Sequence, residues 1–289
     1  MKAFLFNLII RLTSLFNLNT NRKIAKGLAN LVWLLSKKIK HTTQTNINKC
    51  FPELSQEQKA TLAKTSFQNT LMSFFELGPL WKKASNIDDL IENVYGLEEF
   101  ENNINQEQGM FLAVPHHGSW EVLNLLLARF KGYAFLFKPP TDPKLKESLV
   151  KFRGKSNAVQ IEADRKGVRK LLNHVKGNGF VAILPDQKPK SGQGTFAPFF
   201  NQPTYTMTLF SRLAAKTKVP VFFVYAERTK KGFDVHFEKA SEQIYSPMQE
   251  SVEYMNLAIE KIVRQTPEQY QWTYRRFSIQ PEGSENFYK

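Results

Sequence analysis

The chain is 289 residues long, and 42% of its residues are hydrophobic and 13% aromatic. This apolar content is enough to bury a sizeable core, which excludes a disordered protein. With 40 Lys and Arg against 26 Asp and Glu, the net charge is +14, so we expect anionic partners: nucleic acid, an anionic membrane, a phosphorylated substrate or an acidic protein.

The first 40 residues contain two apolar stretches. The opening "MKAFLFNLIIRLTSLFNL" is interrupted by Arg11 and several polar residues, whereas a membrane-spanning helix needs about 20 mostly apolar residues. The following "NLNTNRK" offers no small-residue cleavage site for a secretory signal. In "LANLVWLLSKKIK" an apolar helical run is followed by Lys37, Lys38 and Lys40, which is typical of a helix lying among anionic headgroups. We expect residues 1–40 to be a membrane-associating helical segment; two ordinary core helices are the alternative.

The next segment contains the single cysteine, Cys50, and the start of a long helix. One cysteine cannot form an internal disulfide, which fits a reducing compartment. Cys50 lies far from the histidine-rich segment in sequence, which argues against a nucleophilic role. Ser55 and Gln58 form a capping-box pattern, which predicts a helix running from there towards Trp81.

From about residue 92 onwards, short apolar runs alternate with helical stretches. The runs at 110–114, 133–137, 158–161, 180–184 and 219–226 indicate buried strands, and 233–238 alternates like an additional edge strand. The segments 119–130, 143–153, 166–176, 207–217 and 248–265 are predicted to be helices. The pattern predicts an α/β fold with a largely parallel central sheet flanked by helices. Because no linker or repeat divides the chain, we expect residues 41–289 to form a single domain.

The segment "FLAVPHHGSWEVLNLLL" places His116 just after a strand and Glu121 at the start of a helix. Residues five apart differ by about 140° around an ideal helix, so these side chains can meet only if His116 lies in the turn before it. Pro115 and Gly118 favour such a turn. An ionised Glu121 would keep one imidazole nitrogen protonated, and the other could accept a proton from a substrate alcohol. We therefore assign His116 and Glu121 as a catalytic pair in which the substrate hydroxyl is the nucleophile.

Other interpretations of this segment remain open. No G-x-S-x-G motif surrounds Ser119, which argues against a serine nucleophile. His117 and Glu121 are four residues apart and could share a helical face, but His174 and His236 stand in no recognisable spacing that would complete a metal site. We expect no metal. A polar pair that only caps a helix is the remaining alternative.

The "HHGSWE" block resembles the His-x4-Glu block of the lipid A late acyltransferases, the lauroyl and myristoyl transferases of lipid A biosynthesis. The resemblance covers residues 40–288. The chain departs from the family pattern at His117, where an apolar residue is usual, at Lys138, where Arg is frequent, and at Asp142, where Asn is common. Four further segments resemble family blocks in the expected order: "NINKCFPELSQEQ", "FKPPTDPKLKESLVKFRG", "ILPDQKPKSGQGTFAPFFNQPTYT" and "QYQWTYRRFSIQPEG".

The resemblance implies an O-acyltransferase at the cytoplasmic face of the cell inner membrane. It would take a fatty acyl chain from acyl carrier protein and transfer it to a hydroxyl of a glycolipid, a lipid A precursor, without a cofactor. The resemblance also assigns Arg153 to a phosphate or a developing oxyanion, with a solvated helix end as the alternative. Asp186 and Gln187 are expected to line the site or to make structural hydrogen bonds, and Arg276 to bind substrate or to lie on the surface.

Three other functions would fit parts of the sequence. An acyltransferase for another glycolipid or phospholipid, with acyl-CoA as donor, would share the same chemistry. A nucleic-acid-binding protein would explain the charge, but it leaves the apolar N-terminal segment unexplained, and no recognisable binding motif is present. We therefore expect no nucleic-acid partner. A non-catalytic membrane protein on the same fold is the third alternative.

Overall fold

The computed structural model describes residues 2–82, 84–106, 108–154 and 158–289. The helices are α1 (Lys2–Thr13), α2 (Leu18–Leu35), α3 (Lys37–Cys50), α4 (Gln56–Phe75), α5 (Leu77–Lys82), α6 (Leu97–Asn105), α7 (Trp120–Leu127), α8 (Pro143–Arg153), α9 (Arg165–Lys176), α10 (Leu209–Thr217) and α11 (Met248–Gln265), with short 3-10 helices η1 (Ala84–Leu90), η2 (Glu242–Tyr245) and η3 (Pro267–Gln269). The strands are β1 (Ile91–Tyr95), β2 (Met110–Ala113), β3 (Tyr133–Phe137), β4 (Val159–Glu162), β5 (Phe180–Ile183), β6 (Gly194–Phe199), β7 (Gln202–Met207), β8 (Val221–Arg228) and β9 (Phe233–Lys239).

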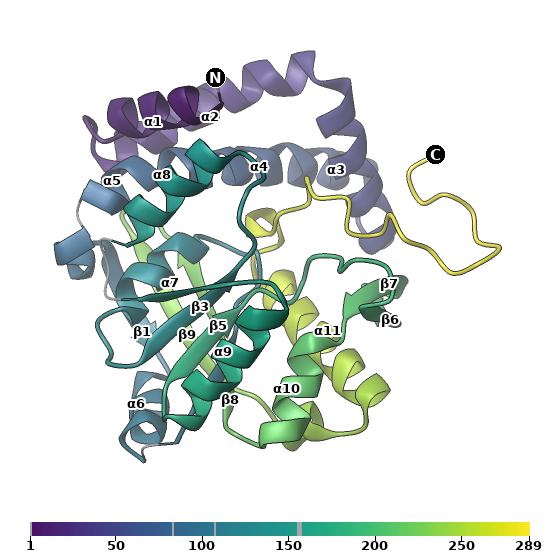
Figure 1. The fold of residues 1–289 in the computed structure, drawn as a ribbon. Coiled ribbons are helices and arrows are strands. Elements are labelled where there is room, and N and C mark those ends of the chain that lie inside the picture. Colours follow the sequence, from purple (N-terminus) through teal and green to yellow (C-terminus); the bar gives the residue numbers. More distant parts are fainter. Residues whose placement is uncertain (1, 83, 107, 155–157) are drawn as a thin grey trace.

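In the described residues, a seven-stranded sheet forms the centre of the fold, in the order β1-β9-β8-β2-β5-β3-β4 (Figure 1). Strands β8, β2, β5, β3 and β4 run parallel to one another, and β9 pairs antiparallel with β8. The prediction of a mixed α/β fold with a mostly parallel sheet and flanking helices is confirmed. The five expected strands are all present, and their bounds differ from the predicted ones by at most two residues. Strand β4 is an edge strand and, unlike the prediction, only its Ile161 is buried.

Two clusters of buried side chains cover the two faces of the sheet. Neighbouring residues of one strand point to opposite faces, so Leu112 of β2 belongs to one cluster and Phe111 and Ala113 to the other. Helices α6 and α7 contribute to the Leu112 side, whereas α9, α10 and α11 contribute to the Phe111 side. Burial on both faces explains why these strands are continuous apolar runs in the sequence.

Two features of the sheets differ from the prediction. Strand β9 is not an edge strand, because β1 pairs with it in parallel on the side away from β8. The β1 sequence "IENVY" is short and mostly exposed, as edge strands often are, so it lacks the apolar run that would reveal it. Strands β6 and β7 form an unpredicted hairpin, because the prolines in "GTFAPFFNQPTYTM" conceal its pattern.

The predicted capping box at Ser55 and Gln58 is confirmed, and it opens α4. The expected long helix breaks at Glu76, the C-terminal cap of α4, and α5 continues towards Trp81. Pro79 lacks the N–H group that a continued helix would need, but a proline is tolerated in the first turn of a new one. Within α5, Trp81 is buried.

The N-terminal part of the chain consists of helices α1, α2 and α3, which lie along one side of the molecule (Figure 1). Arg22 of α2 is buried and donates to the Glu76 carboxylate at 2.7 Å and to the carbonyl oxygens of Thr229 and Gly232. Residue 40, where we expect the membrane-associating segment to end, lies within α3. Among the described helices, none combines the length and the apolar character that crossing a membrane requires.

Candidate active site

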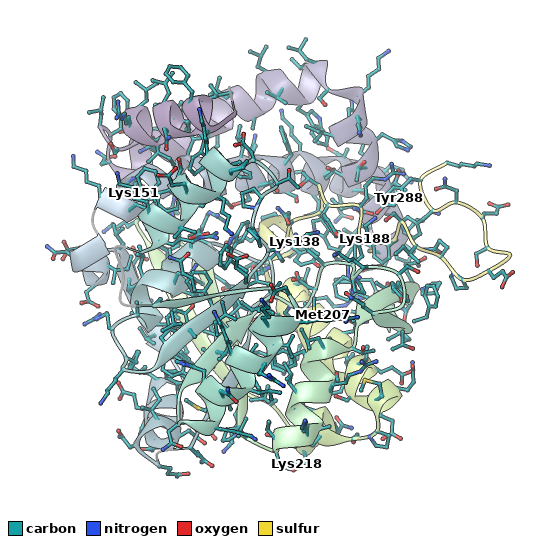
Figure 2. The ribbon with its side chains drawn as sticks, viewed as in Figure 1. Lys138, Lys151, Lys188, Met207, Lys218 and Tyr288 are labelled. Atoms are coloured by element: carbon teal, nitrogen blue, oxygen red, sulfur yellow. The ribbon has the colours of Figure 1, made fainter. Side chains whose placement is uncertain are left out.

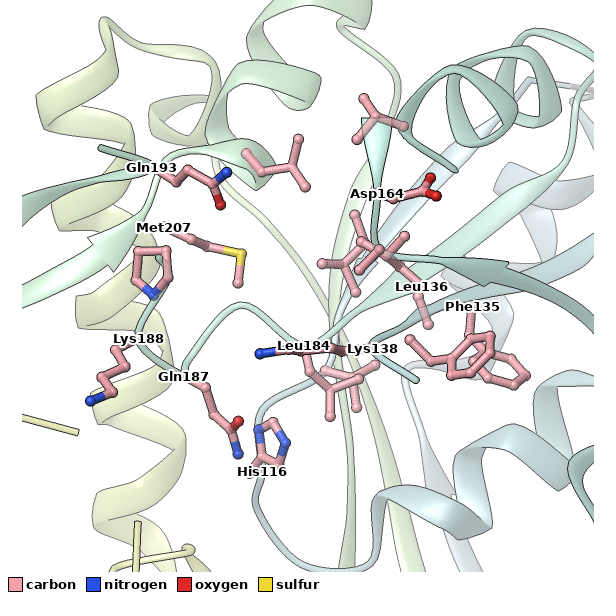
Figure 3. Close-up of a pocket in the computed structure, with 18 of the residues that line it drawn as sticks. His116, Phe135, Leu136, Lys138, Asp164, Leu184, Gln187, Lys188, Gln193 and Met207 are labelled. Atoms are coloured by element: carbon pink, nitrogen blue, oxygen red, sulfur yellow. The ribbon is translucent and has the colours of Figure 1, made fainter. Parts of the chain in front are cut away.

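A cavity of about 850 Å³ lies beyond the carboxyl ends of the parallel strands. This volume falls within the usual range of ligand pockets, roughly 300–1,000 Å³. His116 follows β2, Lys138 follows β3, Asp164 follows β4 and Gln187 follows β5, and all four line the cavity. Figure 3 shows the side chains of Lys138 and Gln187 pointing into the same space as His116. The cavity therefore forms where ligands commonly bind in open α/β sheets.

The ring of His116 is held by Asp186, which comes from the loop after β5. Nδ1 of His116 lies 2.7 Å from Oδ1 of Asp186, and the backbone N–H of His116 donates to Oδ2 at 2.8 Å. Strands β2 and β5 are hydrogen-bonded neighbours with the same direction, so residues that follow them emerge side by side. The carboxylate in contact with the His116 ring is therefore Asp186, not the Glu121 expected from sequence.

The chemistry of this contact defines which ring nitrogen is free. Burial raises the pKa of the Asp186 carboxyl, but the charge of His116 and its two hydrogen bonds outweigh burial, so this pKa lies below its usual range. An ionised carboxylate can only accept hydrogen bonds, so Nδ1 of His116 must carry the proton. In the neutral ring, Nε2 is then the atom able to accept a proton.

Two buried side chains surround Asp186 on the side of the C-terminal segment. Burial and the nearby charge of Asp186 raise the pKa of Tyr270. The Arg276 guanidinium contributes a positive charge that favours ionised Asp186, and it donates to the backbone oxygen of Tyr205 and to Oγ1 of Thr206. Arg276 is buried and is not among the residues that line the cavity, so the surface role considered for it does not apply.

Glu121 forms an ion pair with Arg153 at one wall of the cavity. The guanidinium NH2 of Arg153 contacts Oε1 of Glu121, and its Nε lies 3.3 Å from Oε2. Asn124 also donates to Glu121 at 3.3 Å and accepts from the Tyr133 hydroxyl at 2.7 Å. Although burial lowers the pKa of Arg153, the charge and hydrogen bonds of Glu121 raise it above its usual value. Arg153 lines the cavity and is mostly buried, unlike a solvated helix end.

The turn between His116 and α7 depends on Gly118. Its φ of 58° is in the left-handed region, and an added Cβ would lie 1.9 Å from the backbone oxygen of Ala226. The neighbouring His117 is fully buried, and its Nε2 lies 2.9 Å from Oγ1 of Thr266 and 3.4 Å from Oε1 of Glu227. Burial lowers the pKa of His117. Within the described part of the chain, no group of three or more His, Cys, Asp or Glu residues is arranged to bind a metal ion.

The cavity combines apolar walls with a basic lining. Leu123, Phe135, Leu136, Leu184 and Met207 contribute apolar surface. Most of the charged side chains in the lining are cations: Lys138, Arg153, Arg165, Lys188, Lys190 and Arg212. Such a site can accommodate an apolar chain and attract an anionic group at the same time.

The structure places five of the six predicted site residues in two groups, and Arg276 lies outside both. His116, Asp186 and Gln187 lie together after β2 and β5, and Glu121 and Arg153 form the second group across α7 and α8. Gln187 lines the cavity and donates to Oε1 of Gln271 at 3.1 Å.

Tyr270 beside Asp186 and the Asn124–Tyr133 contact beside Glu121 were not predicted from the sequence. Tyr133 begins an apolar strand, so no sequence signal separates it from core residues. Tyr270 lies in "QYQWTYRRFSIQPEG", and the resemblance of this segment to a family block could have drawn attention to it. Asn124 could have been suspected, since it lies one helical turn after Glu121.

Comparison with known proteins identifies the family. Residues 1–278 match the family described as bacterial lipid A biosynthesis acyltransferase. The chain is 25% identical over 247 residues to the lipid A biosynthesis palmitoleoyltransferase of Escherichia coli K12, an alignment that covers 84% of this chain and 80% of the relative. It is 22% identical over 265 residues to the lipid A biosynthesis lauroyltransferase of the same strain, covering 90% and 86%.

A third relative comes from another genus. The lipid A biosynthesis acyltransferase of Haemophilus influenzae Rd is 24% identical over 262 residues, covering 88% of this chain and 81% of the relative. The resemblance noted in the sequence is therefore confirmed. The chain belongs to the bacterial lipid A biosynthesis acyltransferase family and is an acyltransferase enzyme.

Proposed function

We propose that this enzyme transfers a fatty acyl chain from an acyl carrier protein thioester to a hydroxyl of a lipid A precursor, with His116 as the general base. The observation that carries the proposal is the contact of His116 Nδ1 with Asp186 in a cavity with apolar walls and a basic lining. That contact leaves Nε2 to accept a proton, as general-base catalysis requires.

In the proposed reaction, Nε2 of His116 takes the proton of the acceptor hydroxyl. The hydroxyl oxygen attacks the carbonyl carbon of the thioester and forms a tetrahedral intermediate with a negatively charged oxygen. The carbon–sulfur bond then breaks, the acyl ester of the acceptor forms, and the leaving sulfur receives the proton from the imidazolium. Ionised Asp186 stabilises the imidazolium during this step and keeps the ring oriented.

Arg153 is proposed to neutralise negative charge during the reaction, either on the oxyanion or on a phosphate of the acceptor. Glu121 is essential to this proposal because it holds the guanidinium of Arg153 at the cavity wall. A preorganised cation in a partly buried site stabilises developing charge far better than a mobile one in water. We therefore propose that Glu121 supports catalysis through Arg153, and that Gln187 contacts substrate from the opposite loop.

The remaining lining residues suit the two substrates. The apolar walls would accommodate the acyl chain, because they remove hydrocarbon surface from water. The cations of the lining would bind the phosphate groups of the lipid A precursor and favour the approach of an anionic carrier protein.

We also propose that the enzyme works at the cytoplasmic face of the inner membrane, with α1 and α2 lying on the bilayer surface. Large apolar side chains of both helices are exposed, and Phe4 and Leu34 have 73% and 78% of their surface accessible. The exposed Lys37, Lys38 and Lys40 follow directly, as expected for a helix among anionic headgroups.

The proposal is tested by incubating the purified protein with a lipid A precursor and a mixture of acyl carrier protein thioesters, then measuring the lipid by mass spectrometry. We expect a mass increase of one acyl chain with the wild type and a far smaller yield with His116→Ala. The matching acyl-CoA mixture, assayed in parallel, separates the two possible donors. If the precursor gains no acyl chain from the carrier thioesters, the proposed donor and acceptor pair is incorrect.

A further inference from the structure

Helix α9 presents an unusually basic face beside the catalytic cavity. Leu171 and Val175 are buried against the sheet, as expected for the inner side of an amphipathic helix. Five cationic side chains occupy the outer side and are exposed: Arg165, Lys166, Arg169, Lys170 and Lys176. We call these five residues the α9 basic face.

The distribution of these charges does not stabilise helix α9. The first turn of α9 contains no acidic residue and begins with Arg165 and Lys166, although the partial positive charge of a helix N-terminus disfavours cations there. Like charges at four-residue spacing, such as Arg165 with Arg169 and Lys166 with Lys170, also repel each other. Among the described residues, none of the five forms an ion pair with a carboxylate. An anionic partner would remove this repulsion.

The position of α9 connects the basic face to the reaction site. Arg165 and Val168, in its first turn, line the catalytic cavity, so the helix starts at the cavity wall. From there α9 runs away from the side of the molecule that α1 and α2 occupy (Figure 1). A partner bound to the α9 basic face would therefore lie next to the cavity and away from the proposed membrane surface. This geometry favours a soluble acidic protein over a bilayer.

We infer that the α9 basic face is the docking surface for the acidic carrier protein that delivers the acyl thioester. This inference rests on the proposed function, because it names the surface that recognises the proposed donor. Charge complementarity of this kind mainly accelerates association and weakens as salt is added. The thioester arm of a carrier protein docked on α9 would reach His116 through the cavity that Arg165 borders.

The test compares two donors that carry the same acyl chain: the acyl carrier protein thioester and the free pantetheine thioester. The variant R169E/K170E reverses two charges of the α9 basic face that do not line the cavity. The control K216E/K261E makes the same charge change at exposed residues of α10 and α11, also outside the cavity lining. Circular dichroism and thermal unfolding of both variants establish that they are folded.

We expect R169E/K170E to lower kcat/KM for the carrier donor by about 10-fold or more at low salt, because KM rises. The reversed charges slow the electrostatically steered encounter. The pantetheine donor should react at an unchanged rate, and K216E/K261E should behave like the wild type with both donors. The affinity of acyl carrier protein for each variant, measured by fluorescence anisotropy, should fall in parallel with kcat/KM.

Three results would overturn the inference. An equal loss with both donors would mean that α9 supports the cavity and does not dock the carrier. Unchanged kinetics with the carrier donor would mean that the α9 basic face does not recognise the carrier protein. Weaker binding of R169E/K170E to vesicles containing phosphatidylglycerol, with unchanged carrier affinity, would assign α9 to the membrane. If the wild type uses neither donor, the proposed function fails separately, and the anisotropy measurement still decides whether α9 binds the carrier.

Discussion

Asp186 accepts two hydrogen bonds from His116, one from the ring Nδ1 at 2.7 Å and one from the backbone N–H at 2.8 Å. The backbone bond fixes where the residue lies, and the ring bond fixes how the imidazole is turned. Together they hold the proton on Nδ1 and leave Nε2 able to accept one. This pair is the centre of the proposed mechanism.

Replacing Asp186 by asparagine should therefore disable the base while preserving the size of the side chain. The amide has one accepting oxygen, so it cannot replace both carboxylate contacts, and its NH2 group favours the wrong ring tautomer. We predict that D186N lowers kcat by about 10²–10⁴-fold, the usual scale for general-base catalysis. Steady-state transfer rates of the folded variant test this, and a loss below about threefold would show that Asp186 does not orient the base.

The role of Glu121 can be separated from that of Asp186 by a double-mutant cycle with Arg153. If Glu121 acts by holding Arg153, the E121Q substitution should cost activity in the wild type but little more once R153A is present. A double variant that loses less activity than the sum of the two single losses indicates that both residues act through one interaction. Additive losses in kcat would instead support a direct action of Glu121 on His116, the role that the sequence first suggested.

Helix α1 contacts helix α8, which carries Arg153, through an aromatic cluster. The ring of Phe152 stacks on Trp81 with centroids 4.8 Å apart and meets Phe6 edge-on at 6.3 Å, and the next residue is Arg153. We predict that F6A lowers transfer activity about 10-fold in detergent, because small displacements of a catalytic group are costly. The matched control F4A removes an exposed ring of the same helix and should leave this rate unchanged. Equal rates for F6A and the wild type would exclude coupling between α1 and Arg153.

His117 should make stability depend on pH in a defined direction. Burial lowers its pKa in the folded protein, whereas the unfolded chain titrates near the ordinary value of about 6.5. As the pH falls below that value, the unfolded chain binds a proton that the folded chain does not, so the free energy of unfolding decreases. We predict a steeper fall of Tm between pH 7.5 and 5.5 in the wild type than in H117L. Parallel Tm curves would show that His117 does not cause the dependence.

Much of the parallel sheet could be predicted because its inner strands β2, β5 and β8 are buried on both faces and appear as apolar runs. The strand Tyr133–Phe137 and the helix bounds of α8 and α11 agree with the predicted ranges residue for residue. Strand β1 and the β6–β7 hairpin were missed, because edge exposure and prolines remove the pattern that reveals a strand.

The structure pairs His116 with Asp186, whereas the sequence suggested Glu121 as its partner. The sequence places Glu121 five residues after His116, and this proximity suggested that they touch. In the fold, the order of the strands determines which carboxylate contacts His116. Strand β5 lies beside β2 and brings Asp186 to His116 from 70 residues away. Strand order depends on how the whole chain packs, so it cannot be read from local spacing.

The most direct test of the mechanism is the single-turnover rate of acyl transfer in H116A, measured with and without added imidazole. We predict a rate about 10²–10⁴-fold below that of the wild type, with partial recovery when imidazole enters the cavity and replaces the missing base. A rate within a few-fold of the wild type, in a folded protein, would contradict the assignment of His116 as the general base.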